Sequence, residues 1–157
     1  MLRITRMTTG LVLAAMALSA ATAPLLGQTP QEFVAARQDS MKARAAAGLT
    51  LARMLRGDMP WNAQAAQQAA EQINAEARKM SRLFPDGTGP DRVPKTNALP
   101  AIWQNKADFE SAIGALAQAS QRLAELAQAN DEAGFRTQFR VTGQACASCH
   151  EKFRKPE

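Results

Sequence analysis

Residues 63–83 read AQAAQQAAEQINAEARKMSRL, and this stretch decides the fold class. Apolar residues recur in it at spacings of four and three, at Ala66, Ala70, Ile73, Ala77 and Met80. This periodicity gives an α-helix one apolar stripe and leaves glutamine and charged side chains on its other sides. The stretch therefore predicts an amphipathic helix that packs into a core through a narrow stripe rich in alanine.

Three further stretches of the 157-residue chain predict helices. The first begins with the capping sequence TPQE at residues 29–32 and ends near Arg56, before the breaker sequence GDMP at 57–60. The third runs over about 101–130, and the fourth begins at Asp131, its expected N-cap. The expected inward residues are Phe33, Arg37, Met41, Gly48, Leu51, Ala52 and Leu55 in the first, Phe109, Ile113, Leu116, Ser120, Leu123 and Ala127 in the third, and Phe135, Phe139, Thr142, Cys146, Cys149 and Phe153 in the fourth.

The connections between these stretches define the topology. Residues 84–100 hold four prolines and two glycines, so no helix runs through them and they form one long connection. Only 5% of the residues are aromatic and no stretch alternates as a strand does, which excludes a β-sandwich or barrel. We therefore expect an all-α protein, an antiparallel up-down-up-down four-helix bundle. Alanine buries little apolar area, so the expected core is thin and has room for a large apolar group.

The motif Cys146-Ala147-Ser148-Cys149-His150 carries the chemistry. It is the C-x-x-C-H pattern of covalent haem attachment, which predicts one haem c per chain. Positions i and i+3 of a helix share a face, so both thiols reach the two vinyl groups of one haem and the histidine offers its imidazole to the iron. The alternatives are weaker. A zinc site needs four ligands where the chain has two Cys and one His, a redox pair needs a preceding strand, and a disulfide across one helical turn has poor geometry.

Residues 1–27 have the composition of a secretory signal peptide. Arg3 and Arg6 precede the apolar run 11–18, which is shorter than the roughly 20 residues of a membrane span, and small residues follow it. We expect cleavage between about 21 and 27, a mature domain over 28–157 without a membrane span, and a periplasmic location. Loss of the two arginines lowers the formal net charge from +5 to +3. The basic residues are dispersed and lack interleaved aromatic residues, so nucleic acid is not an expected partner.

From about residue 31 the chain resembles the class II c-type cytochromes, the cytochrome c prime family. The matching stretches are Arg37-Gln38 with Met41-Lys42, Leu83-Phe84-Pro85 with Gly87-Thr88, Pro100-Ala101-Ile102-Trp103 with Asp108-Phe109, and the C-x-x-C-H motif with Phe153-Arg154. The resemblance implies a haem on the last helix, with His150 as proximal ligand and a distal side formed by the first helix. It also implies a homodimer through the first two helices.

Met41 falls at the family's distal position. In one branch an apolar side chain there blocks the iron without binding it, and the five-coordinate high-spin haem takes NO or CO. In the other branch a methionine binds the iron of a low-spin electron carrier. By the same resemblance, Arg37 corresponds to the partner of a haem propionate and Arg154 to the basic residue beside the proximal imidazole. Phe84 and Trp103 either line the haem edge or pack at the corner of the loop.

We expect a carrier that exchanges single electrons with a redox partner protein, with Met41 as the sixth ligand. The alternative is a five-coordinate haem that binds NO or CO. An enzyme is not expected, because the chain has one histidine and because Asp39 and Ser40 do not share the helical face of Met41.

Overall fold

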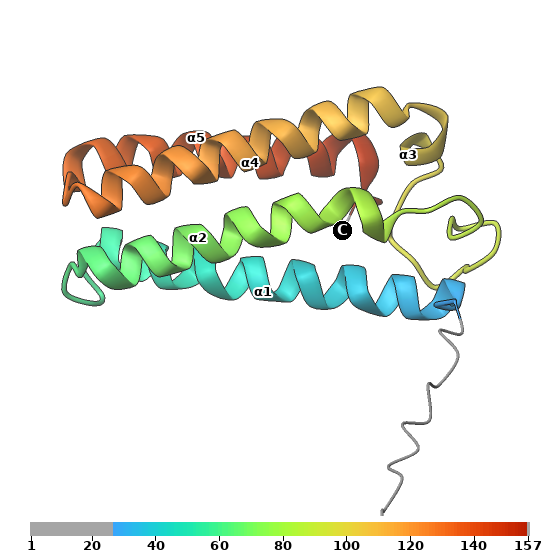
Figure 1. Cartoon of the computed structure of the whole chain (residues 1–157), viewed down its shortest axis with the longest axis horizontal. Helices are drawn as coiled ribbons and strands as arrows, with labels where there is room; N and C mark the ends of the chain where they lie inside the picture. Colours follow the sequence, from blue (N-terminus) through green and yellow to red (C-terminus); the bar gives the residue numbers. More distant parts are fainter. Residues whose placement is uncertain (1–26, 157) are drawn as a thin grey trace, which may run out of the picture.

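The computed structural model describes residues 27–156 and forms an antiparallel four-helix bundle (Figure 1). The expected signal segment, residues 1–27, lies outside the described part except for Gly27. The elements are α1 (Pro30–Arg56), α2 (Ala63–Lys79), the 3-10 turn η1 (Met80–Leu83), α3 (Ala101–Gln104), α4 (Lys106–Gln128) and α5 (Glu132–Phe153). The expected fold class is confirmed. The long connection 84–100 and the short α3 lie together at one end of the bundle.

The helix ends follow the capping signals in the sequence. Thr29 and Glu32 form a capping box at the start of α1, and Gly57 ends this helix with a positive φ of 84°, a conformation that glycine adopts without strain. The side chain of Asp131 accepts a hydrogen bond from the backbone N–H of Gly134 at 2.8 Å, as expected of the N-cap of α5. The local sequence therefore sets where the long helices begin and turn.

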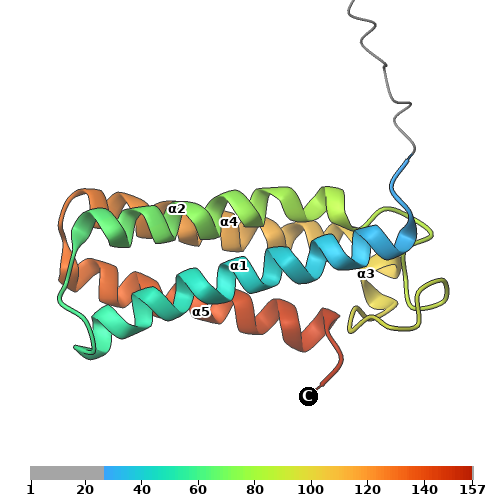
Figure 2. The same ribbon diagram turned by 90° about the horizontal axis from the view of Figure 1, so that it is seen from below.

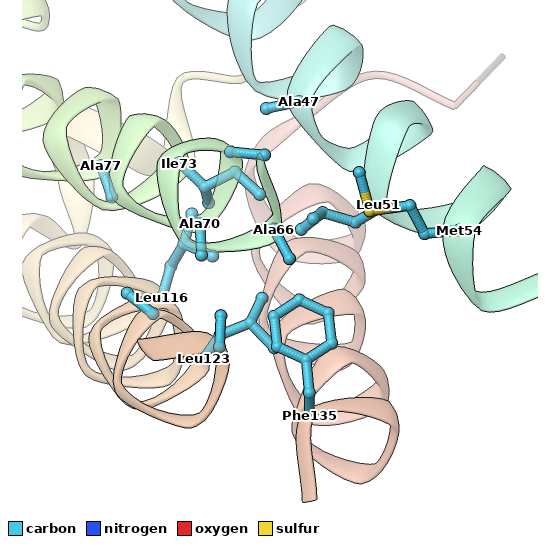
Figure 3. Close-up of a cluster of buried hydrophobic side chains, with 13 residues drawn as sticks. Ala47, Leu51, Met54, Ala66, Ala70, Ile73, Ala77, Leu116, Leu123 and Phe135 are labelled. Atoms are coloured by element: carbon cyan, nitrogen blue, oxygen red, sulfur yellow. The ribbon is translucent and has the colours of Figure 1, made fainter. Parts of the chain in front are cut away.

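The core consists of two clusters of buried side chains. The central cluster comprises Ala47, Leu51, Met54, Ala66, Ala69, Ala70, Ile73, Ala77, Leu116, Leu123, Ala124, Ala127 and Phe135 (Figure 3). The end cluster, next to the loop 84–100, comprises Met80, Phe84, Ile102, Phe109, Ile113 and Phe153. Seven of the thirteen residues in the central cluster are alanine, so each helix contributes little apolar area to the middle of the bundle.

The inward stripes of α2 and α4 lie where the sequence predicts them, whereas that of α1 differs. α1 buries Val34, Ser40, Ala47 and Met54 together with Arg37 and Leu51. Five residues that were expected inside are only half-buried, namely Phe33, Met41, Gly48, Ala52 and Leu55. The stripe is displaced because α1 packs mainly against α2 rather than against two neighbours equally.

The predicted third helix is interrupted at Asn105. The backbone of this residue has φ −130° and ψ 56°, outside the helical region, and it separates α3 from α4. The break lets α3 turn Ile102 into the end cluster while α4 follows the axis of the bundle. The continuous helix expected over 101–130 was therefore wrong at this point, although its inward residues from Phe109 to Ala127 are buried as predicted.

α1 and α5 are the pair of neighbouring helices that pack least. α2 packs against α1 and α4, and α4 packs against α5, but the backbones of α1 and α5 approach each other at hardly any point. Figure 2 shows the two helices crossing, with the N-terminal part of α1 running apart from the C-terminal part of α5 toward the loop end. The bundle is thus splayed on the side where α5 carries the C-x-x-C-H motif. Among residues 27–156 there is no helix both long and apolar enough to cross a membrane.

Candidate haem site

The C-x-x-C-H motif occupies the last two turns of α5. The helix continues through it to Phe153, so Cys146, Cys149 and His150 at i, i+3 and i+4 share one side. Both cysteines are free thiols and half-buried, and His150 is half-buried as well. Burial raises the pKa of both thiols, an effect that the cation of Arg44 partly opposes. The uninterrupted helix meets the geometric requirement for two attachment points on one flat group.

The loop 84–100 holds this end of α5. The backbone N–H of Leu99 donates to the carbonyl of Phe153 at 2.9 Å, and the N–H of Lys155 donates to the carbonyl of Asn97 at 2.8 Å. The ammonium of Lys152 also pairs with Asp108 of α4 at 2.6 Å. These contacts fix the helix end that presents the motif, so the long connection has a structural task.

Met41 on α1 and Cys149 on α5 pack against the same end cluster. Cys146, one turn earlier on α5, packs instead against the central cluster. The motif therefore spans the boundary between the two clusters, and Met41 faces this boundary from the opposite helix. The structure thus places Met41, the predicted distal residue, and Cys149, a predicted attachment residue, against the same cluster.

Neither of the two facing helix segments buries a side chain completely. Between Thr142 and Phe153 on α5, and between Ser40 and Ala47 on α1, every side chain is either half-buried or exposed. Each segment nevertheless borders apolar clusters. Two thiols, one imidazole and two incompletely covered apolar faces are the features that a covalently attached haem needs, so the residues fit this group.

Arg37 is buried and acts as a clamp on the loop. Its side chain is 5% exposed. Nε donates to the carbonyl of Leu83 at 2.6 Å, Nη1 donates to the carbonyl of Thr88 at 2.9 Å, and Nη2 donates to the hydroxyl of Thr88. Burial lowers the pKa of Arg37 to about 10, so the guanidinium remains charged at neutral pH. Three of its five N–H groups are used, which leaves two donors for another partner.

Two aromatic residues enclose this clamp. The guanidinium carbon of Arg37 lies 4.2 Å from the ring centre of Phe84 and 5.4 Å from that of Trp103. The indole N–H of Trp103 donates to the carbonyl of Pro85 at 3.0 Å. These contacts pack both aromatic residues at the corner of the loop, and a place at the haem edge stays a prediction.

Arg154 lies just beyond the end of α5. Its backbone is extended, with φ −120° and ψ 144°, and it forms an isolated antiparallel bridge with Ala98. Its backbone N–H still donates to the carbonyl of His150 at 3.0 Å, so Arg154 closes the last turn of α5. A place for Arg154 beside the imidazole stays a prediction.

Sequence reasoning missed Arg44. Its guanidinium lies between two thioethers, with Nη2 2.7 Å from Sδ of Met41 and Nη1 2.8 Å from Sδ of Met80. It is half-buried, and burial lowers its pKa, an effect that the nearby thiols of Cys146 and Cys149 oppose. The signal was present in the sequence, because Arg37, Met41 and Arg44 follow the i, i+4, i+7 spacing of one helical face.

One surface hollow lies away from the motif. It has a volume of about 540 Å³ and is lined by the turn between α1 and α2, including Trp61, together with Glu132 and Arg136 of α5. This is the opposite end of α5 from the motif, and the hollow is shallow and open to solvent. The chemistry of the C-x-x-C-H motif, rather than the size of a hollow, therefore locates the site.

An antiparallel four-helix bundle with C-x-x-C-H on its last helix has the architecture of the class II c-type cytochromes. The family described as Cytochrome C' matches residues 32–154, and the chain belongs to this family. Proteins of the family carry covalently bound haem c, which confirms the expected cofactor.

Three similar proteins illustrate the match. A cytochrome c' from Pararhodospirillum photometricum is 32% identical over 127 residues, which cover 81% of this chain and 99% of that protein. A cytochrome c-554 from Cereibacter sphaeroides is 33% identical over 108 residues, 68% of this chain and 70% of that protein. The solved structure of cytochrome c prime from Shewanella frigidimarina is 28% identical with a TM-score of 0.75, covering 83% of this chain and 99% of its own.

Proposed function

We propose that this protein carries single electrons on one haem c, with His150 as the proximal ligand and Met41 as the sixth ligand. One observation carries the proposal. Met41 of α1 and Cys149 of α5 pack against the same end cluster, although the two helices are splayed. A haem attached at Cys149 occupies the side of α5 that Met41 faces. Methionine and histidine together raise the reduction potential of a haem, which suits an electron carrier.

Each residue of the site has a distinct task in this proposal. Cys146 and Cys149 hold the haem through thioether bonds, and the bound haem supplies reversible one-electron chemistry at its iron. His150 is kept in place by the helix end that the loop fixes. Arg37 offers its two remaining N–H donors to a propionate, because a forked guanidinium suits a carboxylate. Arg154 supplies positive charge on the proximal side.

The location and partners follow from the same proposal. Removal of the signal segment during export, by cleavage between about 21 and 27, places the mature domain in the periplasm, where haem of this type is attached. There the protein exchanges electrons with a redox partner protein. The family resemblance further supports a homodimer through α1 and α2.

A second candidate function is the binding of NO or CO at a five-coordinate haem. It is favoured by the hydrogen bond from Arg44 to Sδ of Met41, which already engages one lone pair of the sulfur. In this case Met41 covers the iron without binding it. The two functions differ in the spin state of the ferric protein.

Electron paramagnetic resonance of the purified ferric holoprotein tests the proposal. We expect a low-spin spectrum that becomes high-spin in Met41→Ala, with a lower reduction potential and new affinity for CO. Met54→Ala is the matched control, because Met54 lies on the same helix within the central cluster. A wild-type spectrum dominated by high-spin iron and unchanged in Met41→Ala would establish the gas-binding function instead.

A further inference from the structure

Arg44 is a half-buried cation without an anionic partner in direct contact. Its N–H groups point to the sulfur atoms of Met41 and Met80 and, at 3.4 Å, to the carbonyl of Ser40. It forms no salt bridge within residues 27–156, and the nearby Glu76 pairs with Lys79 at 2.7 Å. Thioether sulfur is a weak acceptor, so these contacts compensate poorly for the loss of water around the cation. Packing alone does not account for an arginine at this position.

The place of Arg44 connects it to the haem site. It lies one turn after Met41 on the same face of α1, and its guanidinium contacts Met41 and Met80. Met80 belongs to the end cluster, against which Met41 and Cys149 pack, so the positive charge lies at the cluster that the motif borders. A cation so placed acts on whatever charge the site holds, and it acts strongly because the surroundings are apolar.

We propose that Arg44 is a positioning residue of the distal side, which orients the thioether of Met41 and raises the reduction potential of the haem. This inference rests on the proposed function. A thioether sulfur has two lone pairs, so Met41 can accept the hydrogen bond from Arg44 with one and offer the other to the iron. The positive charge favours the reduced iron, which has one positive charge fewer after it takes one electron from a donor protein.

Three variants of the holoprotein separate charge from geometry. Arg44→Gln removes the charge, Arg44→Lys keeps the charge but loses the planar fork, and Arg53→Gln removes the charge of an exposed arginine on the same helix. The readouts are the reduction potential from spectroelectrochemistry, the ferric spin state, and the mass of the haem-bearing chain.

We expect Arg44→Gln to shift the equilibrium toward oxidised haem about tenfold, or ~59 mV for one electron, and to increase the high-spin fraction. The reduction potential of Arg44→Lys stays close to that of the wild type. This variant shows the same increase in high-spin iron, because the sulfur of Met41 is no longer held by the planar guanidinium. Arg53→Gln matches the wild type in both readouts. The spin-state effect of Arg44→Gln disappears in the Met41→Ala background, since there is no thioether left to orient.

If the reduction potential of Arg44→Gln equals that of Arg53→Gln, the charge of Arg44 does not raise the potential of the haem. If the ferric spin state of Arg44→Lys equals that of the wild type, Arg44 does not position the thioether of Met41. If Arg44→Gln does not hold haem, Arg44→Lys decides the positioning role and Arg44→Met, which fills the space without charge, decides the potential. Failure of the proposed function is distinguishable, because it appears in the wild type as haem that is not covalently bound or as high-spin ferric iron.

Discussion

Arg37→Met tests whether the buried guanidinium holds the loop to the bundle. Methionine fills a similar volume and keeps apolar contact with Phe84, so the change removes the three hydrogen bonds to Leu83 and Thr88 and, in the holoprotein, the proposed contact with a propionate. At a net value of about 1 kcal/mol each, their loss amounts to about 3 kcal/mol. This is a large share of the roughly 5–15 kcal/mol by which domains of this size are stable.

Equilibrium urea unfolding of the holoprotein, followed by circular dichroism, measures this loss. Arg53→Met, at an exposed position of the same helix, is the control and should change the free energy of unfolding by less than about 0.5 kcal/mol. Combining Arg37→Met with Thr88→Val should give a coupling energy of about 1 kcal/mol, because both variants remove the same hydrogen bond. A free energy of unfolding for Arg37→Met within about 0.5 kcal/mol of the wild type would refute the clamp.

Two further predictions concern attachment and export. Combined Cys146→Ala and Cys149→Ala substitution should remove the haem band from a denaturing gel stained for peroxidase activity. The same double variant should melt weakly and without cooperativity, because loss of a large buried ligand costs several kcal/mol where the cavity cannot collapse. A sharp melt near that of the holoprotein would show that the helices bury enough surface alone. The intact mass of the native protein should equal one haem plus a chain that begins between Thr22 and Gln28, and a chain beginning at Met1 would contradict export.

The sequence predicts the parts of the fold that depend on local periodicity and capping. All five stripe residues of 63–83 are buried, since α2 packs against helices on two sides and its period alone decides which face turns inward. The face of α1 was predicted less well, because it depends on how far α1 stands from α5. The break at Asn105 was missed for a similar reason, as it serves the packing of Ile102 rather than a local signal.

The candidate site divides in the same way. Cys146, Cys149 and His150 follow from spacing within one helix, so the sequence identifies them directly. The partners of Arg37 lie 46 and 51 positions away along the chain, and no local pattern announces a contact of that range. Arg44 shares the predicted helical face of Arg37 and Met41, but the contact of its guanidinium with Met80 of the neighbouring element is seen only in the structure.

The loop 84–100 and the residue preceding it determine more than the path of the chain. At its start Leu83 and Thr88 are bound by Arg37 of α1, and at its end Asn97 and Leu99 are bound by the last residues of α5. The same segment is thus anchored to both helices that diverge around the motif. It is a spacer of fixed length, so the width of the opening between α1 and α5 is set by residues that belong to neither helix. Insertions or deletions in this loop are therefore a means of changing how tightly the two helices close on a cofactor without changing any residue that touches it.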